Sequence, residues 1–262
     1  MTDKALPEYT TRQLKEVLET TDLVVISCAS IEPHGPHLPL AADSLQGDRL
    51  IREIAKKLTA AGEPAIAGPV IPFGLLTNQF ERSVADPGNL AIRADTLKAL
   101  LIDLTRSMMR DGFRRFVWVM SHVENEALMH VAAKELADEH GASIVVANWI
   151  QHVNTVYPDV LHGSPVQGHA GEGETARVLA IRPDLVDLEG VEGYYPEPSD
   201  RPEFSQLTYF GGGIGVYHPT GPDESPGYIG EPHLATAADG EVLIDAMADW
   251  IARSAAHYLG GR

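Results

Sequence analysis

Two short clusters of histidine and carboxylate side chains could perform chemistry in this chain. The first is the Glu-Pro-His segment Glu32–His34, which Asp43 follows nine residues after the histidine. The second is the His-Val-Glu segment His122–Glu124. Imidazole nitrogens and carboxylate oxygens are the ligands with which hydrolases hold pairs of divalent metal ions. Together, the two clusters therefore predict a two-metal hydrolytic site.

The first cluster has a spacing that directs its side chains to one side. Residues two apart in an extended backbone point the same way, and Pro33 stiffens the segment between Glu32 and His34. Further prolines shape the loop so that Asp43 can return toward its start. Its two carboxylate oxygens could then bridge two cations, one held with Glu32 and the other with His34.

The second cluster repeats this spacing after another apolar run. Taken separately, each cluster has a plainer explanation, since Glu32–His34 could be a polar loop and His122–Glu124 could cap a helix. Two such pairs at corresponding places are harder to explain in this way, and their joint occurrence favours the metal site.

A third segment, Gly168–Thr175, opens a predicted helix and carries further candidates. Hydrolysis needs a group that gives a proton to the leaving group, and His169 and Glu174 are suited to that role. Glu172 is sufficiently explained by the preference for acidic residues at the start of a helix.

Apolar runs and amphipathic segments alternate along the chain and must position these clusters. The predicted strands are Leu23–Ser30, Ala65–Ile71, Phe116–Met120 and Ile144–Ile150. The predicted helices include Gln13–Glu19, Ser44–Ala60, a segment over Leu97–Met108, Glu124–His140 and Ala235–Tyr258. Continuous apolar strands separated by helices are typical of an α/β fold with a parallel sheet covered on both faces.

The predicted sheet would place both clusters at one edge. In parallel sheets, ligands bind beyond the carboxyl ends of the strands, and Glu32 and His122 each follow a strand directly. The clusters converge if these two strands are neighbours. The segment 182–232 has little periodicity and is long for a connection, so we expect it to fold over the site or to make subunit contacts.

Composition limits the partners of this protein. A length of 262 residues suits a single domain over residues 1–262. The formal net charge of −17 disfavours nucleic acid and anionic membranes as partners. The single cysteine, Cys28, lies in an apolar run and is expected to be a core residue. No run is long enough to span a membrane and the first residues lack a signal core, so we expect a cytoplasmic protein.

The segment Ile31–Leu40 together with Asp43 resembles the signature loop of the creatininase (creatinine amidohydrolase) family. The His122 cluster, the His169 segment and the start of the last helix occur in the order of that family's other motifs. The resemblance implies a three-layer α/β/α fold with a mostly parallel central sheet, assembled as hexamers. It also implies two divalent metal ions per chain, of zinc, manganese or iron.

The resemblance assigns roles to individual residues. Glu32, Asp43 and His122 would hold one metal, and His34, Asp43 and Glu124 the other. His169 would act beside the substrate as acid or base with Glu174 close behind it, and Glu124 could also move a proton. Whether Glu124 or Glu174 completes the second metal's ligands stays open. His37 is expected to stabilise the loop through hydrogen bonds.

The chain departs from creatininase itself at positions that would recognise the creatinine ring. Pro165 and Val166 stand where that enzyme has tryptophan and aspartate, and Val123 stands in place of a tyrosine. We therefore expect a hydrolase that uses metal-activated water on a small polar molecule other than creatinine, at a cyclic or non-peptide amide C–N bond.

Three alternatives stay open at this point. The first is a C–C bond hydrolase that opens a keto-inositol or other β-dicarbonyl ring. The second is a peptidase that acts on a modified peptide. The third is a metal-binding subunit without catalytic activity.

Overall fold

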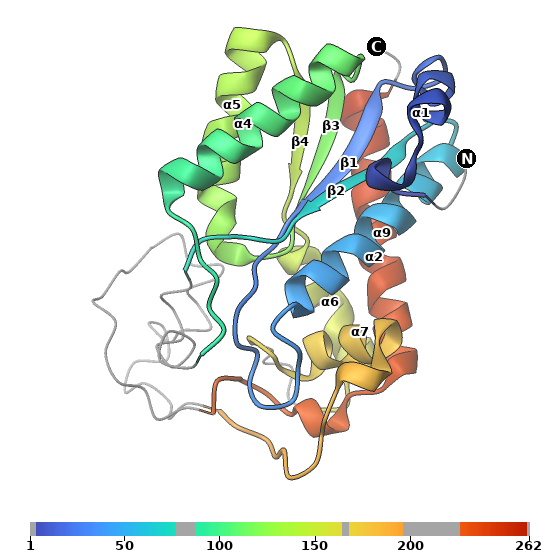
Figure 1. The fold of residues 1–262 in the computed structure, drawn as a ribbon. Helices are drawn as coiled ribbons and strands as arrows, with labels where there is room; N and C mark the ends of the chain where they lie inside the picture. The colour runs from blue at the N-terminus through green and yellow to red at the C-terminus, as the bar shows by residue number, and fades with distance from the viewer. Residues whose placement is uncertain (1–3, 77–86, 164–167, 196–225, 261–262) are drawn as a thin grey trace.

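A parallel sheet between two layers of helices forms the centre of the molecule. The computed structural model describes residues 4–76, 87–163, 168–195 and 226–260. The sheet has the order β2-β1-β3-β4, with β1 at Leu23–Cys28, β2 at Ile66–Ile71, β3 at Arg115–Met120 and β4 at Ser143–Ala147. Helices α2 (Ala42–Ala60) and α9 (Ala237–Leu259) lie on one face, and α4 (Ala94–Asp111) and α5 (Glu126–His140) on the other (Figure 1). The predicted three-layer α/β/α fold is confirmed.

Strands β1 and β3 are neighbours, as convergence of the clusters requires. They pair in parallel and in simple register, from Leu23 opposite Arg115 to Cys28 opposite Met120. All six residues of β1 are buried because helices cover both faces of the sheet. The two strands end level with each other, so the chain segments after them leave from the same edge of the sheet.

Helix ends follow the expected local signals. Thr10 caps α1 (Thr11–Leu18) through its side chain, and Thr236 caps α9 in the same way. Gly112 ends α4 with a φ of +126°, a backbone conformation that favours glycine. The amphipathic helix predicted over Leu97–Met108 is confirmed as part of α4. Leu97, Leu101 and Met108 are buried, and Leu100 and Leu104 are partly buried.

Several boundaries differ from the sequence prediction, and two of the differences concern the site. Helix α2 begins at Ala42 rather than Ser44, so Asp43 lies in its first turn and not in a loop. The predicted helix over Glu124–His140 is divided into a 3-10 turn, η2 (Val123–Asn125), and α5. The prediction of strand through Ile150 was wrong, because β4 ends at Ala147 and the Asn148 side chain accepts a hydrogen bond from the Ile150 amide.

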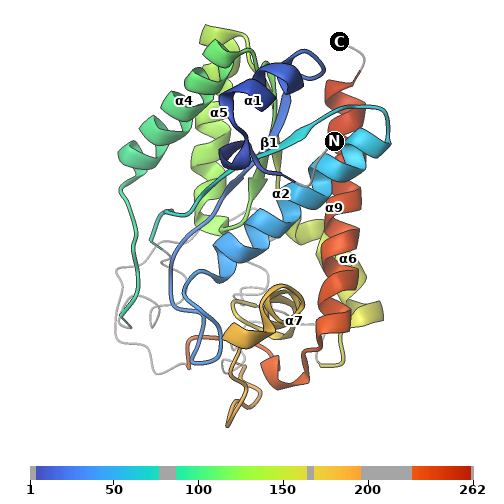
Figure 2. The ribbon, with the colours of Figure 1, turned by 45° about the vertical axis from the view of Figure 1, so that its right-hand side comes forward.

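Ile150 instead begins α6 (Ile150–Val160), a helix that periodicity did not predict. Together with α7 (Glu172–Ile181), it packs against α9 (Figure 2). The other 3-10 turns in the described residues are η1 (Leu6–Glu8), η3 (Pro183–Leu185) and η5 (Pro232–Leu234). No helix in the described part of the chain is long and apolar enough to cross a membrane.

Part of the irregular segment 182–232 lies beside the segment Gly168–Thr175, which carries His169 and Glu174. Tyr194 and Gly230 form an antiparallel bridge, and the Ile229 amide donates to the carbonyl of His169 at 2.9 Å. Residues 196–225 of this segment, as well as Pro165 and Val166, lie outside the described residues. The expectation of a single domain over residues 1–262 stays a prediction.

Candidate metal centre

Glu32, Asp43 and His122 form a compact group of ligand atoms, here called the His122 group. His122 Nδ1 lies 3.1 Å from Glu32 Oε1 and 3.3 Å from Asp43 Oδ2. Ligand atoms bound at about 2.1 Å to one tetrahedral ion are about 3.4 Å apart. The measured separations are thus close to those around a single metal ion.

His34, Asp43 and Glu174 form a second group, here called the His34 group. His34 Nε2 lies 3.3 Å from Asp43 Oδ1 and 3.9 Å from Glu174 Oε2. The two groups therefore share Asp43, which presents a different carboxylate oxygen to each imidazole. This is the arrangement in which one aspartate can bridge two cations.

Local structure explains how Asp43 reaches both histidines. The amide of Glu32 donates to the Leu40 carbonyl at 3.0 Å and closes the loop between β1 and α2. Helix α2 also packs very close to β1, since a Cβ added at Gly47 would lie 2.3 Å from Ser27 Oγ. Glycine at this position allows the first turn of α2 to carry Asp43 to the ends of the strands.

Four of the candidate ligand side chains are buried, and three of their polar atoms lack hydrogen-bond partners among the described residues. Glu32, His34, Asp43 and His122 are each at most 4% exposed. Among the described residues, Glu32 Oε2, His34 Nε2 and Asp43 Oδ2 have no hydrogen-bond partner. Buried polar atoms without partners are costly, and metal coordination would satisfy all three of them. The donor set of imidazole and carboxylate groups therefore fits divalent ions such as zinc or manganese.

Hydrogen bonds on the far side of each imidazole fix its orientation. His122 Nε2 lies 2.9 Å from the Leu75 carbonyl, and His34 Nδ1 lies 3.1 Å from the Glu32 carbonyl. A carbonyl accepts only, so each of these nitrogens carries the proton. In the neutral, metal-binding form of each ring, the other nitrogen would offer its lone pair on the side of Asp43, as in metal-ligating histidines.

Electrostatics show that this cluster attracts positive charge. Burial opposes the charged imidazolium of His34, but Asp43, Glu174 and Glu32 outweigh it and raise the pKa of His34 to about 10. In the same way, Glu32 and Asp43 raise the pKa of His122 well above its usual range against the effect of burial. The pKa of Asp43 is lowered despite burial, because both imidazoles stabilise its carboxylate. Metal ions compete with protons for ligands of this kind.

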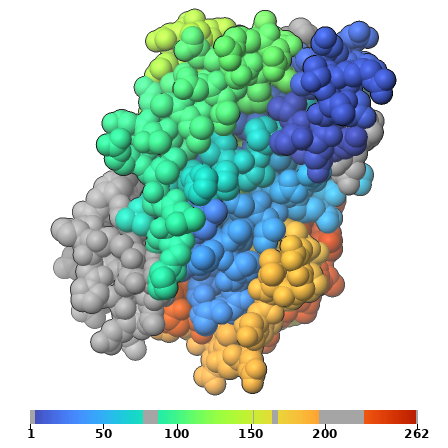
Figure 3. All heavy atoms as spheres, viewed as in Figure 1, coloured from blue at the N-terminus to red at the C-terminus, as the bar shows by residue number. Residues whose placement is uncertain are grey.

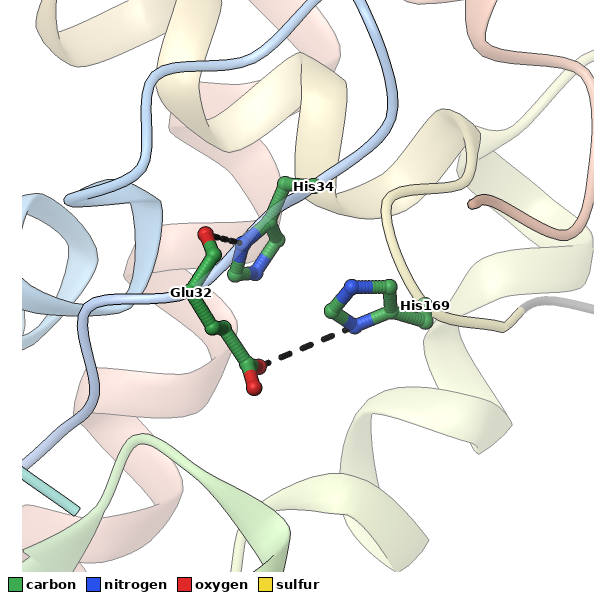
Figure 4. A group of neighbouring side chains, drawn as sticks. All are labelled: Glu32, His34 and His169. Carbon is green, nitrogen blue, oxygen red and sulfur yellow. Dashed lines mark hydrogen bonds and ion pairs between the residues drawn. The ribbon is translucent and has the colours of Figure 1, made fainter. Parts of the chain in front are cut away.

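His169 stands at the side of the two groups, and its ring approaches that of His34. The ring centroids are 4.3 Å apart, and His169 Nδ1 lies 4.0 Å from Glu32 Oε1 (Figure 4). His169 Nε2 lies 2.9 Å from the Pro33 carbonyl and therefore carries the proton in the neutral ring. The lone pair of Nδ1 then points toward the site. Glu32, His34 and His169 also lie close enough together to form a third possible ligand group.

The backbone next to His169 is held in an uncommon conformation. Ala170 is fully buried with a φ of +49°, which costs a non-glycine residue about 1 kcal/mol or more. Its amide donates to Glu174 Oε2 at 2.7 Å, and its carbonyl accepts from His37 Nε2 at 3.0 Å. Burial lowers the pKa of His37 to about 4, so the ring is neutral near pH 7. The expected loop-stabilising role of His37 is thus visible in its hydrogen bonds.

Helix α7 supplies two glutamates with different surroundings. Glu172 is fully buried and accepts backbone hydrogen bonds from His162 at 2.7 Å and Gly163 at 2.9 Å, so it fixes the chain after α6. Glu174 faces the site, and behind it the fully buried Arg177 places Nη2 3.6 Å from Glu174 Oε1. Sequence reasoning missed Arg177, although a charged residue one turn after Glu174 on a short apolar helix was a usable signal.

Glu124 and Cys28 complete the list of expected residues. Among the described residues, Glu124 belongs to none of the three ligand groups, whereas Glu174 belongs to the His34 group. A ligand role for Glu124 stays a prediction. Burial raises the pKa of the Cys28 thiol to about 12, which makes it a poor nucleophile, in keeping with a core residue.

The cluster is more open on one side than on the other. The side chains of Glu174 and His169 are 17% and 9% exposed, against 2% for Glu32. In the space-filling view, the blue surface of α2 and the loop before it lies between the green α4 side and the gold segment around α7 (Figure 3). The exposed fraction is therefore larger on the side of Glu174 and His169 than on the side of Glu32.

Comparison with known proteins finds several hydrolases that are similar to this chain over most of its length. The chain is 24% identical over 245 residues to creatinine amidohydrolase from Pseudomonas putida, covering 88% of this chain and 87% of that protein. It is 22% identical over 258 residues to 3-dehydro-scyllo-inosose hydrolase from Thermotoga maritima, with 92% and 79% covered. It is 29% identical over 247 residues to the mycofactocin precursor peptide peptidase from Mycobacterium tuberculosis, with 92% and 87% covered.

Solved structures show the same fold. A crystal structure of creatinine amidohydrolase (creatininase) superposes with a TM-score of 0.78 at 24% identity, covering 98% of both chains. A manganese form of creatininase gives a TM-score of 0.76 at 24% identity, covering 97% of both chains. At this level of identity, these likenesses concern the fold.

Fold and site together define a metal-dependent hydrolase. The chain belongs to the creatininase family, because the family model described as "Creatininase: Creatinine amidohydrolase" matches residues 7–255. This membership confirms the resemblance found in the sequence and disfavours a metal-binding subunit without catalytic activity.

Proposed function

We propose that this protein is a dinuclear metal-dependent hydrolase that cleaves an amide C–N bond. Glu32, Asp43 and His122 would hold one ion, and His34, Asp43 and Glu174 the other. The observation that carries this proposal is the position of Asp43, whose two oxygens each lie 3.3 Å from a different imidazole nitrogen. Glu124 is the alternative to Glu174 as a ligand of the second ion.

When bound, two divalent ions would supply a water nucleophile at neutral pH and polarise the substrate carbonyl. The protein's own contribution to proton transfer would come from His169. Its Nε2–H is held by the Pro33 carbonyl, so Nδ1 is the atom that can accept a proton and pass it to the leaving nitrogen. The strained Ala170 backbone next to it would keep the ring facing the cluster.

The first candidate substrate is a small polar molecule with a cyclic or non-peptide amide. Creatinine itself is disfavoured. By the family resemblance, Pro165, Val166 and Val123 stand at positions where creatininase has residues that recognise the creatinine ring. The metal ligands are retained while these recognition groups are absent, which suggests the same chemistry on another molecule.

A second candidate is a peptide bond in a modified peptide. It is favoured by the 29% identity with the mycofactocin precursor peptide peptidase, which exceeds the 24% identity with creatinine amidohydrolase. The similarity to 3-dehydro-scyllo-inosose hydrolase keeps C–C cleavage of a keto-inositol ring as a third outcome. In all three cases, hydrolysis would begin with attack of water on a carbonyl carbon.

A substrate panel can test these proposals directly. Protein loaded in turn with Zn²⁺, Mn²⁺ or Fe²⁺ would be incubated with cyclic amides, short peptides, keto-inositols and creatinine, and mass spectrometry would detect addition of water. We expect turnover of an amide other than creatinine, and none with His34→Ala. Rapid hydrolysis of creatinine would contradict the substrate argument, and the absence of bound metal would contradict the dinuclear site.

We also propose a cytoplasmic homohexamer, as the family resemblance implies. Light scattering coupled to gel filtration would then give six times the mass of one chain. A monomer at micromolar concentration would contradict this assembly without affecting the proposed chemistry.

A further inference from the structure

Asn125 joins the segments that follow three neighbouring strands of the sheet. It is fully buried in η2, and its Nδ2 donates to the Ala29 carbonyl at 3.0 Å and to Cys28 Sγ at 3.3 Å, both at the end of β1. Its Oδ1 accepts a hydrogen bond of 2.9 Å from the Leu75 amide, in the segment after β2. Among the described residues, the hydrogen bonds of this amide thus go to backbone groups and to the Cys28 thiol, and none goes to the ligand cluster itself.

Leu75 connects Asn125 to a proposed metal ligand. Its amide is held by Asn125, and its carbonyl accepts the hydrogen bond from His122 Nε2 at 2.9 Å. Hydrogen bonds on both sides of Leu75 restrict its backbone, so the carbonyl has a defined direction. A Cβ added at Gly74 would lie 2.6 Å from the Ala29 carbonyl and 2.8 Å from Asn125 Oδ1. The lack of a side chain at Gly74 therefore lets the backbone come close enough for Asn125 to hold the Leu75 amide.

We infer that Asn125 is a positioning residue for the metal centre, although it does not touch the ligand atoms. By holding Leu75, it keeps the His122 proton on Nε2 and directs Nδ1 toward Glu32 and Asp43. This inference rests on the proposed metal site. It assigns to an uncharged core residue a specific effect on metal affinity at the His122 group.

The physical reason is the preference of metal-ligating histidines for a fixed partner on the second nitrogen. Loss of such a partner typically costs about 10–100-fold in metal affinity. Truncation of Asn125 would leave the Leu75 amide and the Ala29 carbonyl without partners, and the Leu75 carbonyl could turn away from His122. The ring could then rotate or move its proton to Nδ1, where it would block coordination.

Three variants separate positioning from simple loss of stability. Asn125→Ala removes the connection. Asn125→Asp retains the oxygen that accepts from the Leu75 amide, and Leu136→Ala removes apolar volume from the buried face of α5 without touching the network. Zn²⁺ affinity would be measured by competition with a chromophoric chelator, and the ligand field by the visible spectrum of the Co²⁺-loaded protein.

We expect Asn125→Ala to bind Zn²⁺ at one site about tenfold more weakly and to change the Co²⁺ spectrum. Asn125→Asp should restore most of the affinity, and Leu136→Ala should lower the melting temperature while the affinity and spectrum stay unchanged. Equal affinities and spectra for the Asn125→Ala protein and the wild type would overturn the inference. An equal loss of affinity in Leu136→Ala would also overturn it, because the effect would then follow stability.

Two further measurements keep the test decisive. If Asn125→Ala does not fold, Gly74→Ala disturbs the same contact from the other side and should also weaken Zn²⁺ binding, whereas wild-type affinity in that variant would count against the inference. A wild-type protein that binds no Zn²⁺ would instead show that the proposed function fails. The two failures are therefore distinguishable.

Discussion

The two ligand groups that share Asp43 differ in how they are held and how far they are exposed. The His122 group lies at the ends of neighbouring strands, and its side chains are at most 4% exposed. The His34 group relies on a loop and on Glu174 from α7, which is 17% exposed and lies next to His169. Under the proposed function, the enclosed His122 group would hold one ion, and the more exposed His34 group would hold the ion that meets the substrate.

The largest effect is expected where the two halves meet, at Asp43. In Asp43→Asn, an NH₂ group would face one of the two imidazoles, so bridging is lost and both ions should bind poorly. Loss of metal activation is worth several kcal/mol, so turnover should fall about 10³-fold or more. Metal analysis and activity assays would check this result. Asp48→Asn, at a half-buried position on the same helix whose side chain pairs with Arg52, should change neither. Two tightly bound ions in Asp43→Asn would rule out the shared carboxylate.

His169 should affect catalysis without affecting metal content. Because it is proposed to move a proton rather than to hold an ion, His169→Ala should lower kcat about 10²–10⁴-fold. Both ions should remain, as measured by metal analysis of the same preparation. The exposed His130→Ala is the matched control. Loss of an ion along with activity would show that His169 belongs to the ligands, as the third group allows.

The two glutamates of α7 should give opposite results. Glu174→Gln keeps an oxygen for the Ala170 amide but loses the charge, so the second ion should bind about 10–100-fold more weakly while the first is retained. Glu172→Gln would spoil one of two buried hydrogen bonds to backbone, which should lower stability by about 1–3 kcal/mol and leave metal binding intact. Calorimetric metal titration and thermal unfolding would separate the two effects. Unaltered binding of both ions in Glu174→Gln would favour Glu124 as the ligand.

The smallest effect concerns the pH dependence of stability. In metal-free protein, the pKa of His34 is raised to about 10 by the surrounding carboxylates against the effect of burial. Because this pKa lies above the unfolded value near 6.5, the protonated ring stabilises the fold fully below about pH 6.5, and this contribution is lost as the pH rises through 10. A bound metal ion would take the place of the proton at Nε2, so the stability of the metal-loaded protein should not depend on this protonation.

The gain in melting temperature upon metal loading should therefore be several degrees larger at pH 9 than at pH 6. Differential scanning calorimetry with and without chelator would measure the gain at each pH. In the metal-free wild type, the His34 ring causes part of the pH dependence of stability. Metal-free His34→Ala protein should lack that part. An equal gain at both pH values in the wild type would contradict the assigned electrostatics.

Much of the fold could be predicted because the signals are local. A continuous apolar run such as Leu23–Cys28 can be buried only with both faces covered, and Thr10 and Gly112 mark helix ends by their own chemistry. Helix α6 was missed because it contains Pro158, a residue that disfavours the interior of a helix. The start of α2 was placed two residues late, since helix boundaries depend on contacts beyond the local sequence.

What the sequence determined by itself was the set of ligand types and the two-residue spacing that brings Glu32 and His34 to one side of an extended segment. Which glutamate lies beside the imidazole of His34 was decided only by tertiary structure. Glu124 is close to His122 in sequence, yet Glu174 lies beside His34, because packing of α7 against α2 and α9 brings a segment 140 residues away to the ends of the strands. Local chemistry selects which groups can bind a metal, whereas long-range packing selects which of them meet.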